Sequence, residues 1–357
     1  MNASAPVARR RNTLSSSLGL GDKIFSSSDE RRFAREIEDG LEVVEDGLLV
    51  EMSFADDIAD VTSRYLLDAG GKRVRPLLTL LAAQLGGGNS DRVYAAAKAI
   101  EITHLASLYH DDVMDESQMR RGVPSAQAVW GNSVAILTGD LLFARASKLV
   151  ASLGERVIQL QADTFERLCL GQLHETIGPR EGEDVIEHYL QVLADKTGSL
   201  ISAAAEIGVI CAGAPEDYRV PVVTFGEKIG VAFQLIDDII DLADSGAETG
   251  KVPGTDLRAG VSTLPLLYLR ESALTDAGAA ALLARIEREV EAIGQGQATA
   301  DIDAAIAELR DHEVTARTRA EAQRWAREAV AALAPLPDGP VKKSLTRFAD
   351  TVIERSN

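Results

Sequence analysis

Two clusters of aspartates have the residue types and spacing of a divalent-cation site. One reads DDVMD at 111–115 and the other DDIID at 237–241. In each cluster the first and fifth residues lie one helical turn apart, so their carboxylates share a face, about 5–6 Å apart at Cβ. Carboxylates this close repel one another unless a cation neutralises them, and oxygen ligands without His or Cys favour Mg²⁺ before Ca²⁺. The spacing therefore predicts magnesium binding at both clusters.

A lone DDxxD also fits the solvated acidic face of a helix. Two copies argue against that interpretation, because each lies in an apolar helical pattern, and Leu235, Ile236, Ile239 and Ile240 flank the second one closely. An EF-hand is excluded, because the turn position has no glycine and the segments have a helical pattern.

A basic cluster offers the matching chemistry for an anion. GGKRVRP at 70–76 has two glycines for close backbone approach and three cations, Lys72, Arg73 and Arg75. This pattern suits an anion site at the start of a helix. It is not a phosphate-binding loop of the GxxxxGK[ST] type, because Leu66 stands in place of the first glycine. A second basic pair, at 120–121, follows the first aspartate cluster.

Helical periodicity runs through almost the whole chain and would position these residues. A capping pattern at Ser27 and Glu30 precedes a first amphipathic helix. No stretch alternates like a strand, so we expect one all-α domain over 28–357, a disordered tail over 1–27, and a polar loop from Asp244 to Gly260. The further helices are expected at 55–68, 74–85, 91–110, 133–152, 155–176, 183–212, 218–244, 262–272, 276–293, 301–332 and 338–354.

Composition narrows the class of protein. Of 357 residues 46% are hydrophobic and only 4% aromatic, which fits a helical core of Ala, Leu, Ile and Val. With 55 acidic and 37 basic residues the formal net charge is −18, which disfavours nucleic acid and requires local cations for any anionic substrate. Cys169 and Cys211 lack metal or redox spacing, so we expect buried thiols in a reducing cytoplasm. No apolar run is long enough to span a membrane.

The motifs together resemble those of the trans-isoprenyl (polyprenyl) diphosphate synthases, over about Gly70 to Pro265. GGKRVRP (70–76), DDVMD followed by RRG (111–122), FQLIDD (233–238) and KVPGTDL (251–257) are similar to the family's motifs in the same order. The resemblance implies an isoprenoid-synthase-type helical bundle around a central cavity, usually a homodimer. It also implies condensation of isopentenyl diphosphate with an allylic diphosphate.

The resemblance also implies a role for individual residues. Isopentenyl diphosphate would be held by Lys72, Arg75, His104 and Arg121. The allylic diphosphate would be held by Arg120, Lys196, Thr197, Gln234 and Lys251. Three Mg²⁺ ions would be bound by Asp111, Asp115 and Asp237, with Asp112, Asp238 and Asp241 in the same catalytic clusters. One departure is Val261, which stands where the family usually has another phosphate-binding lysine.

Product length is expected to depend on the helix that precedes the first aspartate cluster. In the family the growing chain runs beneath that cluster. Here Ser107, Ala106 and Thr103 are small over the preceding turns, which predicts a product longer than geranylgeranyl and a quinone side-chain precursor.

Four other functions remain open from the residues. Farnesyl or geranylgeranyl synthases share these motifs, and a class I terpene cyclase shares the fold but would leave GGKRVRP unexplained. A non-catalytic helical partner subunit would have lost the carboxylates, and a structural cation-binding protein would bind Mg²⁺ without turnover.

Overall fold

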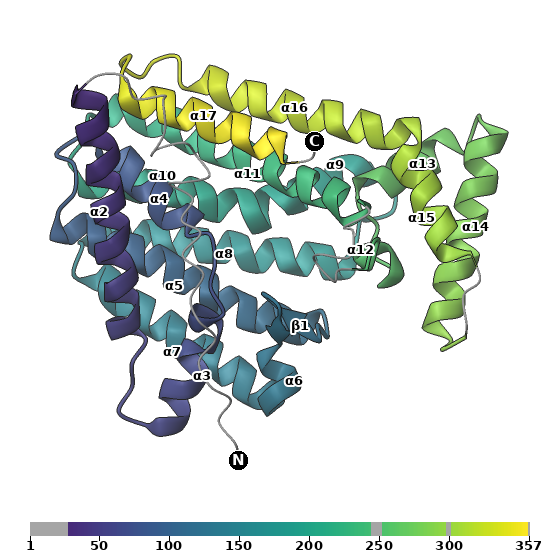
Figure 1. Cartoon of the computed structure of the whole chain (residues 1–357), viewed down its shortest axis with the longest axis horizontal. Helices are drawn as coiled ribbons and strands as arrows, with labels where there is room; N and C mark the ends of the chain where they lie inside the picture. The colour runs from purple at the N-terminus through teal and green to yellow at the C-terminus, as the bar shows by residue number, and fades with distance from the viewer. Residues whose placement is uncertain (1–27, 244–251, 298–300, 356–357) are drawn as a thin grey trace. The chain divides into compact units, whose positions relative to one another are not determined.

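The computed structural model describes residues 28–243, 252–297 and 301–355, and over these residues it is all-α as predicted (Figure 1). The only strands among them are β1 (Met119–Arg120) and β2 (Val123–Pro124), which pair antiparallel. The predicted tail over 1–27 and Lys251 lie outside the described residues. Within the predicted polar loop, the described part contains a short helix, α12 (Thr255–Arg258).

The chain forms two compact units. Of the described residues, the first unit comprises those up to Glu166, those of Leu200–Gly226 and those of Leu333–Arg347. The second comprises those of Arg167–Ser199, those of Glu227–Ala332 and those from Phe348 onward. Each unit is described by itself, and the expectation of a single domain stays a prediction.

The helices lie close to the predicted segments. The first unit contains α2 (Ser28–Glu51), α3 (Asp57–Asp68), α4 (Val74–Ala83), α5 (Asp91–Met114), α6 (Ala126–Trp130), α7 (Asn132–Ala151) and η2 (Glu216–Tyr218). The second contains α9 (Val185–Leu193), the π-helical turn η1 (Ala194–Gly198), α12, α13 (Leu264–Ser272), α14 (Ala277–Gly294), α15 (Ile302–Asp311) and α16 (Glu313–Ala332). Four helices contribute residues to both units: α8 (Glu155–Ile177), α10 (Ser199–Cys211), α11 (Arg219–Asp241) and α17 (Pro340–Glu354).

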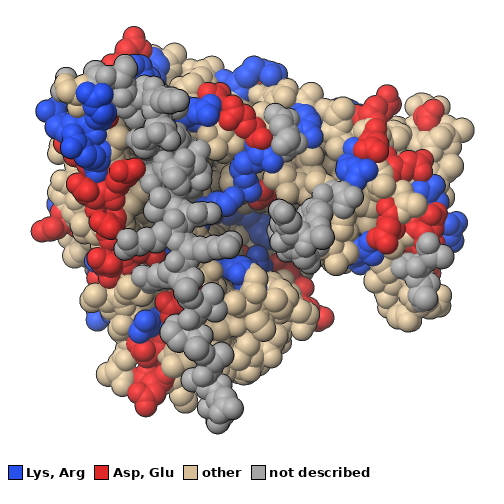
Figure 2. Space-filling model, viewed as in Figure 1, with Lys and Arg blue, Asp and Glu red and all other residues tan. Residues whose placement is uncertain are grey.

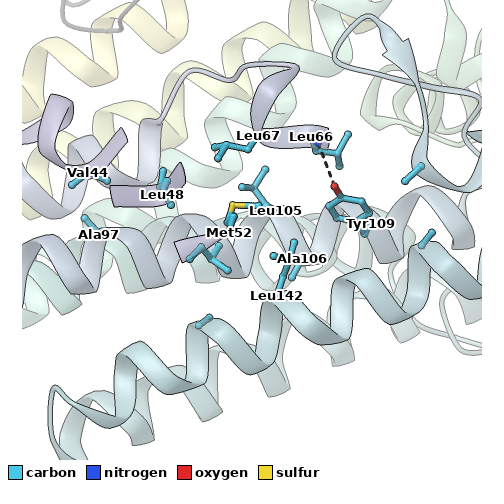
Figure 3. Packing of buried hydrophobic residues seen from close by; sticks show 14 residues of the cluster. Val44, Leu48, Met52, Leu66, Leu67, Ala97, Leu105, Ala106, Tyr109 and Leu142 are labelled. Atoms are coloured by element: carbon cyan, nitrogen blue, oxygen red, sulfur yellow. Dashed lines mark hydrogen bonds between the residues drawn. The ribbon is translucent and has the colours of Figure 1, made fainter. Parts of the chain in front are cut away.

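Helix α5 is the central element of the first unit and packs against α7, α4 and α2. It begins at the N-cap Ser90, whose hydroxyl accepts from Val93 N at 3.4 Å. Its buried face contacts Met52, Leu66 and Leu142 in an apolar cluster (Figure 3). The polar end of α5 is thereby fixed by the packing of its apolar turns.

Helix α2 shows the predicted amphipathic pattern. Phe33, Ile37, Val44 and Leu48 are buried, while acidic side chains gather along its outer face (Figure 2). Much of the negative charge of the first unit therefore lies on a solvated helix surface.

Two predicted helices are interrupted in the structure. The segment predicted at 183–212 contains the π-turn η1, and the segment predicted at 301–332 breaks at His312, whose backbone is extended. At that break the Thr315 hydroxyl donates to Leu309 O at 2.7 Å, so a side chain replaces a helical backbone bond. The two cysteines also differ: Cys211 is buried as expected, but Cys169 is exposed, so that part of the prediction is wrong.

Candidate active site

The first aspartate cluster lies on the last turn of α5. Asp115 is the residue after the helix, and its N–H donates to Asp111 O at 2.8 Å, which preserves the one-turn spacing. Asp112 is fully buried and its Oδ1 accepts from Arg120 Nη2 at 2.6 Å and Nε at 2.7 Å. Burial raises the pKa of Asp112, and the charge of Arg120 opposes that rise. Asp112 is thus a buried carboxylate with a charged partner, while Asp115 is exposed.

A second feature of the first unit is the set of three arginines, Arg73, Arg75 and Arg121, around His104. We call these four residues the arginine cradle. Burial lowers the pKa of His104 well below its ordinary value, and the charges of Arg75 and Arg121 lower it further. His104 is therefore neutral at physiological pH and can donate one hydrogen bond. Burial lowers the pKa of Arg75 to about 10, with Glu101 opposing the shift. Arg75 still carries its charge at neutral pH.

Backbone geometry and buried acids hold the cradle together. Arg73 has a left-handed backbone (φ 51°), and its guanidinium binds Glu45 at 2.6 Å and the buried Glu101 at 3.3 Å. Arg121 donates to Leu66 O at 2.8 Å and to Gly70 O. Gly71 has φ 149°, a backbone conformation that residues with a Cβ rarely adopt, so a substitution there would strain the turn. Three of the four residues predicted to hold isopentenyl diphosphate (Arg75, His104 and Arg121) thus lie together, with exposed Lys72 beside them in sequence.

The second aspartate cluster ends α11, in the second unit. Asp238 is buried, and the Tyr189 hydroxyl donates to its Oδ2 at 2.7 Å. Burial, together with the charges of Asp256 and Asp237, raises the pKa of Asp238 to about 7, although the hydrogen bond from Tyr189 opposes the rise. Asp237 accepts from Arg355 Nη2 at 3.1 Å.

Asp241 has a different environment. Its carboxylate accepts from Thr255 N at 3.2 Å and from Asp256 N at 3.1 Å, at the start of α12. Its backbone carbonyl accepts from Gly254 N at 2.7 Å. Asp241 therefore caps the short helix α12 within the predicted polar loop.

The residues predicted to hold the allylic diphosphate are partly brought together. Lys196 and Thr197 lie in η1; Lys196 forms an ion pair with Glu175, and the Thr197 hydroxyl donates to Gln234 Oε1 at 3.4 Å. Arg120 belongs to the first unit, where it binds Asp112. Val261, the departure from the family pattern, is 46% exposed.

The small residues of α5 have unequal surroundings. Ala106 is fully buried and lies next to Leu142 of α7, while Tyr109 turns toward Leu66 of α3 (Figure 3). Thr103 is buried and donates to Ala99 O at 2.9 Å. Ser107 is half-buried, with its hydroxyl donating to His104 O at 2.9 Å.

The carboxylates fit Mg²⁺ bound together with a phosphate ligand. Among the described residues no group of three or more His, Cys, Asp or Glu side chains converges on one point. Mg²⁺ usually takes one or two carboxylates and completes its shell with water and substrate phosphate oxygens. Asp111 and Asp237, each half-buried at a helix end, suit that mode of binding.

Several site residues were missed from the sequence: Glu45, Glu101, Tyr189 and Arg355. Glu101 carried a signal, because it is a charged residue between Ile100 and Ile102 in the apolar part of α5. Tyr189 and Arg355 carried none, because each meets its aspartate only through tertiary packing, 49 and 118 positions away in sequence.

An all-helical fold with two DDxxD clusters and a basic cradle defines the class of prenyltransferases that act on diphosphate esters. The chain belongs to the Polyprenyl synthetase family, whose profile matches residues 56–301. It is 43% identical over 345 residues to the nonaprenyl diphosphate synthase of Mycobacterium tuberculosis, covering 96% of this chain and 98% of that protein.

Solved structures agree with this assignment. A decaprenyl diphosphate synthase from Rhodobacter capsulatus is 36% identical with a TM-score of 0.79, covering 92% of this chain and 99% of that one. A geranylgeranyl pyrophosphate synthase from Corynebacterium glutamicum, complexed with calcium and isoprenyl diphosphate, is 38% identical with a TM-score of 0.78, covering 94% and 99%. Within the described residues no helix is long and apolar enough to cross a membrane.

Proposed function

We propose that this prenyltransferase is a Mg²⁺-dependent trans-polyprenyl diphosphate synthase that makes a product longer than geranylgeranyl. The observation that carries the proposal is the arginine cradle, whose His104 lies on the same helix as the first aspartate cluster. A terpene cyclase binds one diphosphate and has no use for a second cationic site. A synthase must hold two diphosphates at once, which the cradle and the aspartate clusters would do separately.

Each group of residues has a role in this proposal. Lys72, Arg75, His104 and Arg121 hold isopentenyl diphosphate, with His104 as a hydrogen-bond donor. Asp111, Asp115 and Asp237 hold three Mg²⁺ ions. The allylic diphosphate is bound by Arg120, Lys196, Thr197, Gln234 and Lys251.

The reaction follows from this charge arrangement. Mg²⁺, when bound, neutralises the negative charge that grows on the allylic diphosphate as its C–O bond breaks. Arg120 and Lys196 stabilise the same leaving group. The double bond of isopentenyl diphosphate attacks the allylic cation, forming a C–C bond, and the proton then lost is taken up by the departing diphosphate. The apolar faces of α5 keep water from the cation.

Incubation with isopentenyl diphosphate, farnesyl diphosphate and Mg²⁺ tests the activity. We expect all-trans products longer than twenty carbons, read by chromatography after dephosphorylation. Cyclic hydrocarbons from the allylic substrate alone, or Mg²⁺ binding without turnover, would contradict the proposal.

Product length is argued from α5 and from the relatives. The M. tuberculosis relative is named for a nonaprenyl product and the R. capsulatus one for a decaprenyl product, but the C. glutamicum one is named for geranylgeranyl at similar identity. Overall sequence similarity therefore does not determine the length of the product. The prediction of a long product rests on the small side chains of Ser107, Ala106 and Thr103. Ser107→Phe should shorten the product toward geranylgeranyl.

Ala106→Phe is a second, less clean variant. It should shorten the product too, but Ala106 is fully buried against Leu142, so overpacking should cost about 1–3 kcal/mol of stability. Melting temperatures separate the two effects. Unchanged product lengths in both folded variants would remove Ser107 and Ala106 as length determinants.

Exposed apolar residues support a homodimer. On α7 and the first part of α8, Ile136, Leu137, Leu141, Ile158 and Phe165 are 38–61% exposed. Apolar patches of this kind mark protein interfaces. Leu137→Glu should convert a dimer into monomer in sedimentation velocity, and a wild-type monomer at micromolar concentration would reject the idea.

A further inference from the structure

The turn that carries Lys196 and Thr197 has an unusual geometry. Between α9 and α10 the backbone forms the five-residue π-helical turn η1, where the sequence predicts one continuous helix. Such single π-turns are rare and occur frequently at functional sites. Because the extra residue shifts the side-chain register, something must hold this turn in place.

Arg167 of α8 makes the main polar contacts of this turn. Its Nε and Nη2 lie 2.9 and 2.8 Å from Asp195 Oδ1, and its Nη1 lies 2.9 Å from Glu227 Oε2 of α11. The other oxygen of Asp195 accepts from Gln191 Nε2 at 3.0 Å. The Asp195 side chain is only 12% exposed, so its charge depends on these partners. Arg167 thus links α8, η1 and α11 through one planar guanidinium.

Glycines let the same three elements approach closely. A Cβ on Gly171 of α8 would lie 3.0 Å from both Asp195 Cβ and Lys196 Cγ. A Cβ on Gly230 of α11 would lie 2.6 Å from Gly198 Cα. The backbones of α8 and α11 therefore pack against two sides of η1. Arg167 adds the positive charge that pairs with Asp195 of this turn.

The two charged residues of η1 both have a partner on α8. Asp195 binds Arg167, and Lys196 forms an ion pair with Glu175 two helical turns further along. Lys196 is thereby held in position next to Thr197, whose hydroxyl bonds Gln234.

We propose that Arg167 and Asp195 are positioning residues that hold η1 so that Lys196 and Thr197 meet the allylic diphosphate. The proposal rests on the function proposed above, in which these two residues bind that substrate. Neither Arg167 nor Asp195 is proposed to touch the substrate, and their effect passes through the backbone of η1.

Steady-state kinetics of Asp195→Asn and Arg167→Ala test the proposal. Asp195→Asn keeps the size of the side chain but removes the charge that Arg167 binds. We expect the KM for the allylic primer to rise about tenfold in each variant, with kcat reduced and the KM for isopentenyl diphosphate changed by less than twofold. Arg167→Lys should recover part of the loss, because one charged contact remains. A double variant should be no worse than the poorer single one, since the two residues act as a pair.

The matched control is Arg156→Ala. Arg156 also lies on α8 and forms an exposed ion pair with Glu216 at 2.7 Å, outside this network, so its kinetics should equal wild type. If Arg167→Ala does not fold by circular dichroism, the isosteric Asp195→Asn decides the matter. Equal changes in both KM values, or a lower melting temperature with unchanged KM values, would overturn the positioning role.

A parallel Lys196→Ala variant separates this inference from the function on which it rests. If Lys196→Ala leaves the allylic KM unchanged, the proposed role of Lys196 fails. If Lys196→Ala raises it and Asp195→Asn does not, the ligand role stands and the positioning proposal is wrong.

Discussion

The two aspartate clusters each bury their second carboxylate, but they give it different partners. In the first unit Asp112 meets the charged Arg120, and in the second unit Asp238 meets the neutral hydroxyl of Tyr189. A guanidinium compensates the buried charge, so Asp112 can remain ionised without metal. A phenol stabilises Asp238 less, and its pKa rises to about 7. The second carboxylate of the motif therefore has a charged partner in one unit and a neutral partner in the other, where the arginine, Arg355, binds Asp237 instead.

The largest expected effect comes from removing the carboxylates proposed as metal ligands. Asp111→Ala and Asp237→Ala should each lower turnover more than a hundredfold at saturating Mg²⁺, because the leaving group loses its main charge stabilisation. Helicity by circular dichroism should stay unchanged, since removing one of several like charges relieves repulsion. If either variant kept a tenth of the wild-type rate, the proposed metal role of that cluster would be wrong.

The partners of the buried aspartates should differ in their effect on stability. Arg120→Ala leaves Asp112 buried without a counter-charge, which should cost about 3 kcal/mol of unfolding free energy in EDTA. Tyr189→Phe removes one hydrogen bond and should cost about 1–2 kcal/mol. Urea unfolding followed by circular dichroism measures both. Equal losses would show that the charge of Arg120 is not what distinguishes the two clusters.

The cradle allows a comparison between the two substrates. Arg75→Ala should raise the KM for isopentenyl diphosphate about ten- to a hundredfold, as expected for one lost charged hydrogen-bond partner, and change the allylic KM much less. Lys72→Ala should act in the same direction, more weakly because Lys72 is exposed. An equal rise for both substrates would mean that the cradle does not form a separate site.

The smallest effect concerns the pH dependence of stability without metal. The pKa of Asp238 is raised from 3.8 to about 7, so between these values the folded state binds a proton that the unfolded state lacks. Unfolding free energy should therefore fall as pH rises from about 5.5 to 7.5, by on the order of 2 kcal/mol. Melting temperatures in EDTA at pH 5.5 and 7.5 measure this change. Asp238→Asn, which keeps an acceptor for Tyr189, should flatten the slope, and an unaltered slope would assign it to other groups.

Most of the fold could be predicted from the sequence because long amphipathic helices carry a strong periodic signal. The π-turn could not be predicted, because nothing in the sequence ADKTG distinguishes a π-turn from an α-helix, and its packing against α8 and α11 is visible only in the structure. For the site, the aspartates and the GGKR cations were recognisable from local spacing. Their side-chain partners were not, since Glu45, Tyr189 and Arg355 approach through tertiary structure and have no fixed spacing to the motifs.

The capping role of Asp241 affects how many residues can be inserted into the polypeptide between α11 and α12. Asp241, at the end of α11, accepts hydrogen bonds from the start of α12 through its carbonyl and its carboxylate. The two ends of the segment that connects α11 to α12 are therefore hydrogen-bonded directly to each other. Because the two ends of such a segment are held together, each doubling of its length costs only about 0.6 kcal/mol of additional loop-closure entropy. Insertions after Leu242 and before the KVPGTDL motif should therefore leave both helices folded.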